Sequence, residues 1–119
     1  MGEAALSHVF LHVASLAVTR SFYVDLIGLV VLADEPGYLR LGGGGGFRLG
    51  IEERGPEEIG SAGMQLVIRV TDVDTTAALL RSAGVDVRDP ADQEWGARHA
   101  WLHDPDRYPV SIFTMREDR

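Results

Sequence analysis

Two histidines near the N-terminus have side chains suited to acid–base chemistry. His8 and His12 stand on either side of Phe10 in the segment Ser-His-Val-Phe-Leu-His-Val. Side chains alternate between the two faces of a strand, so an extended segment places all three residues on one face. An imidazole there can act as a general base while Gln65 or Ser111 donates a hydrogen bond to an oxyanion. The spacing therefore permits a metal-free acid–base site at His8 and His12.

Aromatic and polar residues along the chain are candidates for lining a ligand cavity. Aromatic rings offer flat contact area at a low cost in conformational entropy. The candidate ligand-binding residues are Phe10, Tyr38, Gln65, Trp95, His99, Trp101 and Ser111. Packing in the core is the alternative explanation for Phe10 and Trp101.

Composition limits the classes of partner. The chain has 119 residues, 45% of them hydrophobic and 24% charged, which is typical of one globular domain. Its net charge of −7 argues against nucleic acid and favours a neutral or cationic partner. Cysteine is absent, so thiolate chemistry and disulfides are excluded. No signal peptide and no apolar run of about 20 residues is present, so we expect a cytoplasmic protein with no membrane partner.

The strand and helix that position these residues belong to a pattern that occurs twice in the sequence. A strand within residues 6–13 leads into a helix that begins at Ser15 and ends at Gly28. We expect its buried stripe to contain Val18, Phe22 and Leu26, with Tyr23 and Ile27 beside it. About half a chain length later, a strand over residues 65–70 leads into a helix that begins at residues 71–74 and ends at Gly84. Its buried stripe is predicted to contain Val73, Ala77 and Leu80.

Three strands follow each helix. The predicted strands cover residues 30–33, 38–41 and 47–53 in the first copy, and 85–87, 98–103 and 108–115 in the second. We predict a single domain with module 1 at about residues 5–54, a linker at about 55–62 and module 2 at about 63–116. The linker leaves open whether the modules pair within one chain or between two.

Several short motifs occur in a characteristic order. They are Leu6-Ser7-His8-Val9, Ser21-Phe22-Tyr23 through Leu26-Ile27-Gly28-Leu29, Asp72-Val73-Asp74, Ala83-Gly84-Val85-Asp86-Val87, Trp95-Gly96 and Asp104-Pro105-Asp106. Together with the order of elements, they resemble the vicinal oxygen chelate superfamily of glyoxalases, bleomycin-resistance proteins and extradiol dioxygenases. The resemblance implies an α+β fold in which two tandem βαβββ modules form a curved, half-open barrel with the helices outside. It also implies a small-molecule site on the concave side and a homodimer.

The resemblance bears on metal binding as well. Metal-using members place one ligand on each of four strands, and these positions correspond to His8, Gly50, Gln65 and Ser111. Both expected carboxylates are missing, so no metal or other cofactor is expected. If a divalent metal is bound, His8, Gln65 and Glu52 are the candidate ligands, with another histidine as a further donor.

Three functions remain open from the sequence. The first is a binding protein of the glyoxalase/bleomycin-resistance type that sequesters a small cationic or aromatic natural product, such as an antibiotic. The second is a lyase, isomerase or dioxygenase that uses a divalent metal with a displaced ligand set. The third is a metal-free acid–base enzyme that uses His8 and His12.

Overall fold

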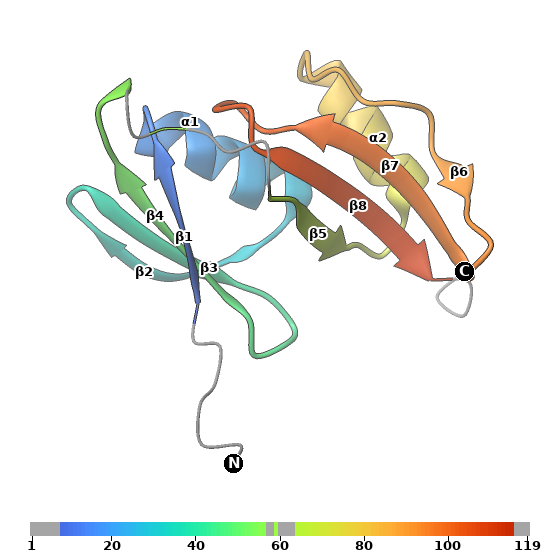
Figure 1. The fold of residues 1–119 in the computed structure, drawn as a ribbon, viewed down its shortest axis with the longest axis horizontal. Coiled ribbons are helices and arrows are strands. Elements are labelled where there is room, and N and C mark those ends of the chain that lie inside the picture. Colours follow the sequence, from blue (N-terminus) through green and yellow to red (C-terminus); the bar gives the residue numbers. More distant parts are fainter. Residues whose placement is uncertain (1–7, 57–58, 60–63, 116–119) are drawn as a thin grey trace. The chain divides into compact units, whose positions relative to one another are not determined.

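The computed structural model describes residues 8–56, 59 and 64–115. The chain divides into two compact units between Gly60 and Ser61. Each unit has a strand, a helical segment and three further strands, in that order (Figure 1). The predicted α+β fold with two tandem βαβββ modules is therefore confirmed.

The first unit contains a four-stranded mixed sheet. Its strands are β1 (Val9–Val13), β2 (Val30–Glu35), β3 (Tyr38–Gly42) and β4 (Arg48–Glu53), in the spatial order β1-β4-β3-β2. Strand β1 is parallel to β4, and the other pairs are antiparallel. Leu11 and Val13 are buried on one face of β1, as the alternation predicts, while Phe10 on the other face is 44% exposed.

The helical segment of the first unit differs from a regular α-helix. It begins as α1 (Leu16–Arg20), where the Val18 N–H donates to the Ser15 side chain at 3.2 Å. It continues as a π-helix, η1 (Ser21–Ile27), and Gly28 ends it at a φ of 102°. These predicted ends are confirmed.

The buried stripe predicted for this segment is wrong in part. Val18 is 52% exposed and Leu26 is half-buried, but Phe22 is buried as predicted. Thr19 is buried as well, together with Tyr23 and Ile27, which were expected beside the stripe. A π-helical turn contains more residues than the 3.6 of an α-helix, so a spacing of four residues keeps these side chains on one face.

The second unit repeats this arrangement. It contains β5 (Leu66–Arg69), α2 (Val73–Ser82), β6 (Ala91–Asp92), β7 (Ala97–His103) and β8 (Pro109–Met115), with the sheet order β5-β8-β7-β6. Helix α2 buries Val73, Ala77 and Leu80 as predicted, and the Asp72 side chain caps its first turn. The strand predicted at residues 85–87 is wrong. Val87 is buried but its carbonyl accepts from the Arg81 guanidinium at 2.8 Å. The Arg88 N–H donates to the Trp101 carbonyl of β7 at 3.2 Å, and the regular ladder with β7 begins at Ala91.

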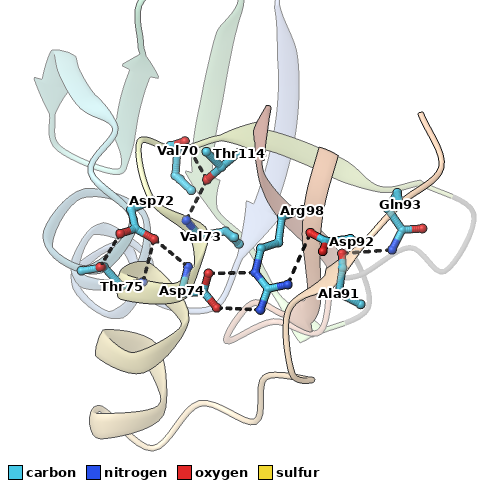
Figure 2. A network of polar contacts seen from close by, with 10 residues as sticks. All are labelled: Val70, Asp72, Val73, Asp74, Thr75, Ala91, Asp92, Gln93, Arg98 and Thr114. Carbon is cyan, nitrogen blue, oxygen red and sulfur yellow. Dashed lines mark hydrogen bonds and ion pairs between the residues drawn. The ribbon is translucent and has the colours of Figure 1, made fainter. Parts of the chain in front are cut away.

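Polar contacts fix α2 to one face of this sheet, which we call the outer face (Figure 2). The Val73 N–H donates to the Thr114 hydroxyl at 2.7 Å, and that hydroxyl donates to the Val70 carbonyl at 3.2 Å. Arg98 donates to both carboxylate oxygens of Asp74, at 2.8 and 3.1 Å. Because Arg98 and Thr114 point to α2, their neighbours along β7 and β8 point to the opposite face, which we call the open face.

No helix in the described part of the chain is long and apolar enough to span a membrane.

Candidate functional site

Phe10 lies on the face of the first unit's sheet that is opposite to the buried Leu11 and Val13, and we call this the open face of that unit. It is the register partner of Gly50 on β4, and a Cβ added at Gly50 would lie 2.8 Å from the Phe10 ring. The ring centroids of His8 and Tyr38 lie 4.8 and 6.0 Å from that of Phe10. The structure therefore brings the predicted site residues His8, Phe10 and Tyr38 together, with Phe10 occupying the space beside Gly50.

His12 lies on the same face, farther along β1. Its register partner on β4 is Glu52, whose carboxylate accepts from the Arg54 guanidinium at 2.7 Å. His8 is exposed and His12 is half-buried. The two candidate catalytic histidines are thus placed on one face with the Phe10 ring between them, as the alternation predicts.

Four rings cluster on the open face of the second unit. His99 of β7 lies at the centre, and the centroids of Trp101, Trp95 and Phe113 lie 4.5, 5.5 and 5.7 Å from its own. We call Trp95, His99, Trp101 and Phe113 the aromatic platform. The strands β7 and β8 that carry three of these rings are adjacent (Figure 1).

Phe113 was absent from the residues predicted to bind a ligand. Its position two residues after Ser111 was the available signal, because alternate residues of a strand share a face. The antiparallel register confirms this placement, with His99 opposite Phe113 and Trp101 opposite Ser111.

The centre of the aromatic platform contains buried polar atoms without hydrogen-bond partners in the described part of the chain. His99 is 8% exposed, and neither of its ring nitrogens has a hydrogen-bond partner among the described residues. The Ser111 hydroxyl is also buried without a partner in that part of the chain. Burial lowers the pKa of His99 from its ordinary value of 6.5, since a charged imidazole loses its hydration there. His99 is therefore a neutral ring at neutral pH, with one nitrogen as donor and one as acceptor.

A groove of about 340 Å³ adjoins the platform at Trp101. It is lined by Gln65, Asp86, Arg88, Trp101, Leu102, His103, Pro109 and Val110. The predicted site residue Gln65 lies here. Asp86 and Arg88 were not among the predicted site residues, because Asp86 lies in the segment 85–87 that was expected to be an ordinary strand and Arg88 directly follows it. The groove therefore has an aromatic wall, one carboxylate and one guanidinium.

The sequence profile of the Glyoxalase/Bleomycin resistance protein/Dioxygenase superfamily matches residues 5–112. The chain belongs to this superfamily. None of the curated protein sequences matches the chain at a significant level.

Solved structures of the superfamily's fold resemble the chain along almost its whole length. TnmS3, an antibiotic binding protein from Streptomyces sp. CB03234, is 27% identical with a TM-score of 0.78, covering 97% of this chain and 98% of that chain. A glyoxalase/bleomycin resistance protein from the same Streptomyces strain is 29% identical with a TM-score of 0.71, covering 90% and 98%. A protein of unknown function from Agrobacterium tumefaciens str. C58 shares the fold, with 22% identity, a TM-score of 0.79 and 96% coverage of both chains.

The ligand positions of metal-using superfamily members do not fit a metal in this chain. Gly50 carries no donor, and the Phe10 ring takes the space of a side chain there. Across residues 8–56, 59 and 64–115, no three His, Asp or Glu side chains gather closely enough to hold an ion. His8 and Gln65 supply one imidazole and one amide, which carry no negative charge to offset a divalent cation.

Proposed function

We propose that this protein binds an aromatic natural product, such as an antibiotic, and sequesters it without altering it. The observation that carries the proposal is the aromatic platform on the open face of the second unit. Its rings meet at centroid distances of 4.5 to 6.1 Å, and Trp95 at its edge is 57% exposed. Exposed tryptophan beside other rings offers a planar ligand a large apolar contact.

Likeness to TnmS3 supports the same proposal. That protein is described as antibiotic binding, and the alignment covers nearly all of both chains at 27% identity. Superfamily membership alone does not favour binding over catalysis, because glyoxalases and dioxygenases share the superfamily. In the part of the chain that the structure describes, the lack of a fitting metal-ligand set favours binding over metal-dependent catalysis.

The groove beside Trp101 bears on the charge of the ligand. The net charge of −7 favours a neutral or cationic ligand, and the groove is lined by both an acidic residue, Asp86, and a basic one, Arg88. A ligand with a bare charge would be attracted by one of these groups and repelled by the other. We therefore propose an aromatic ligand without a strong net charge, whose polar substituents extend into the groove.

Binding is tested by titrating a panel of aromatic antibiotics into the protein and into Trp101→Ala by calorimetry. We expect at least one compound to bind, with an affinity about ten-fold lower in the variant because a stacking surface is lost. Phe47→Ala is the matched control, since Phe47 is an exposed ring of the first unit outside the platform. Equal affinity for the wild type and Trp101→Ala would contradict the proposed site.

Catalysis is tested on the same samples. Mass spectrometry of a bound compound after prolonged incubation is expected to return the compound unchanged. A product whose formation is lost in His8→Ala or His12→Ala would instead support the metal-free acid–base enzyme. A product that requires an added divalent metal would support the metal-dependent enzyme.

Homodimer formation also remains a proposal for this chain. Sedimentation analysis of the purified protein is expected to give twice the monomer mass of 13.0 kDa.

A further inference from the structure

We propose that His99 selects ligands whose aromatic ring carries a hydroxyl group, by hydrogen-bonding that hydroxyl once the Trp95 ring has moved aside. The inference rests on the proposed binding function and deepens it. It makes Trp95 a movable cover and His99, with Ser111, the specificity-determining pair of the aromatic platform.

His99 lowers the stability of the protein when no ligand is bound. Its two ring nitrogens are buried and lack partners among the described residues. A buried polar group without a hydrogen bond destabilises the folded state, whereas a phenyl ring would pack against Trp101 and Phe113 without this cost. Histidine is therefore unfavourable for the free protein at this position, and a ligand that bonds to its nitrogens removes the penalty.

Trp95 controls the access of a ligand to His99. Trp95 lies edge-on to His99, with 5.5 Å between the ring centroids, and is 57% exposed. It stands in a turn closed by the Gly96 N–H to the Gln93 carbonyl at 3.1 Å and the Gln93 N–H to the Ala97 carbonyl at 2.7 Å. These bonds are between backbone groups, so the indole can rotate outward without breaking them. The outward rotation opens a path to His99 for a flat ligand.

The donors and acceptors of His99 and Ser111 match a hydroxyl group on the ligand. A neutral imidazole has one donor and one acceptor nitrogen, and the Ser111 hydroxyl can do both. Ser111 faces the same side of the sheet, opposite Trp101 in the register and diagonal to His99. A ring hydroxyl also donates and accepts, so it can satisfy either nitrogen of His99 and the serine. An apolar ring of the same shape gains the stacking and leaves the nitrogens unsatisfied.

The test compares 2-naphthol with 2-methylnaphthalene, which differ in whether the ring carries a hydroxyl or a methyl group. Affinities are measured by NMR titration for the wild type and for His99→Phe. The wild type is expected to prefer 2-naphthol, and His99→Phe to lose about ten-fold in affinity for it while binding 2-methylnaphthalene unchanged. The unliganded variant is also expected to melt at a higher temperature than the wild type.

A matched control separates the two effects. Thr19 in the first unit is likewise buried with an unpartnered hydroxyl. Thr19→Val is expected to raise the melting temperature in the same way and to leave both affinities unchanged. His99→Gln restores a donor and an acceptor, so we expect it to recover part of the preference for 2-naphthol.

Three results would count against the inference. Equal affinities of the wild type and His99→Phe for 2-naphthol would overturn it and leave the proposed function standing. Failure of both compounds to bind any of these proteins would overturn the inference alone if an antibiotic of the panel binds the wild type, and would overturn the proposed function as well if none does. Unchanged nitrogen resonances of His99 on saturation of the wild type with 2-naphthol would overturn the hydrogen bond directly.

Discussion

The Phe10 ring occupies the space that a side chain at Gly50 would need. A Cβ at residue 50 would lie 2.8 Å from Cε1 and 3.0 Å from Cδ1 of Phe10. Residue 50 is also the position that the sequence resemblance assigns to a metal-ligating carboxylate of metal-using members. The glycine and the phenylalanine are thus coupled, since a side chain at residue 50 fits only if the Phe10 ring moves or is removed.

This coupling predicts the stability of variants at residue 50. Gly50→Ala is expected to lower the free energy of unfolding by about 1–3 kcal/mol, because the new methyl group overpacks against Phe10. In a Phe10→Ala background the same change is expected to cost less. Urea denaturation of the four proteins gives the coupling energy. Equal costs in both backgrounds would show that the ring does not fill this space in solution.

Two fully buried threonines are expected to respond differently to the same substitution. Thr114 bonds to the Val73 N–H and the Val70 carbonyl, whereas the Thr19 hydroxyl has no partner among the described residues. Thr114→Val leaves two backbone groups unsatisfied, so we expect a loss of about 1–3 kcal/mol in the free energy of unfolding. Thr19→Val is expected to be stabilising, because it removes a buried hydroxyl that has no hydrogen bond to lose in that part of the chain. Thermal and urea unfolding distinguish the two, and a similar loss in both variants would contradict the hydrogen-bond assignment.

The burial of His99 is expected to make the stability of the protein depend on pH. Its pKa in the folded protein is lowered by burial, so between that value and 6.5 the unfolded chain binds more protons than the folded one. The free energy of unfolding therefore falls as the pH drops below about 6.5 and levels off beneath the folded-state pKa. The charged and titratable residues that share this face or adjoin it are Arg69, opposite Phe113 in the register, Glu94 in the Trp95 turn, and Asp86, Arg88 and His103 in the groove beside Trp101.

The measurement is the difference in unfolding free energy between His99→Phe and the wild type. It is expected to grow in favour of the variant as the pH is lowered from about 7 to about 5. The other histidines are present in both proteins, so the difference isolates His99. A difference that does not change with pH would show that His99 is hydrated in solution.

The ion pair between Arg98 of β7 and Asp74 of α2 is expected to contribute a measurable interaction free energy. It donates to both carboxylate oxygens of Asp74, and its side chain is 27% exposed. A double-mutant cycle with Arg98→Ala and Asp74→Ala is expected to give a coupling of up to about 1 kcal/mol that weakens in high salt. The more exposed Arg20–Asp34 pair of the first unit is the control, and its coupling is expected to be smaller. A larger coupling for Arg20–Asp34 would contradict this ranking.

Local signals in the sequence account for most of the fold. Alternation placed His8 and Phe10 on one face of β1, and the side chains of Ser15 and Asp72 marked the helix starts because they accept from backbone N–H groups. The exposed position of Val18 was not predictable from a 3.6-residue period, since the π-helical turn changes which residues share a face.

The candidate site was predictable only in part. Trp95, His99 and Trp101 were identified as aromatic or polar residues that could line a cavity. Their meeting with Phe113 depends on the register between β7 and β8, which is a non-local property. The lack of hydrogen-bond partners for His99 among the described residues likewise depends on what surrounds the ring after folding, so no sequence motif predicts it.

Arg98 and His99 are neighbours in the chain that point to opposite faces of β7. Arg98 holds the strand to α2 and β6, while His99 faces the aromatic platform. Residues of the open face can therefore be exchanged without disturbing the contacts that hold the strand in place. A scaffold of this kind is suited to directed evolution, because libraries at residues 95, 99, 101 and 113 would vary ligand preference while the anchoring residues stay constant.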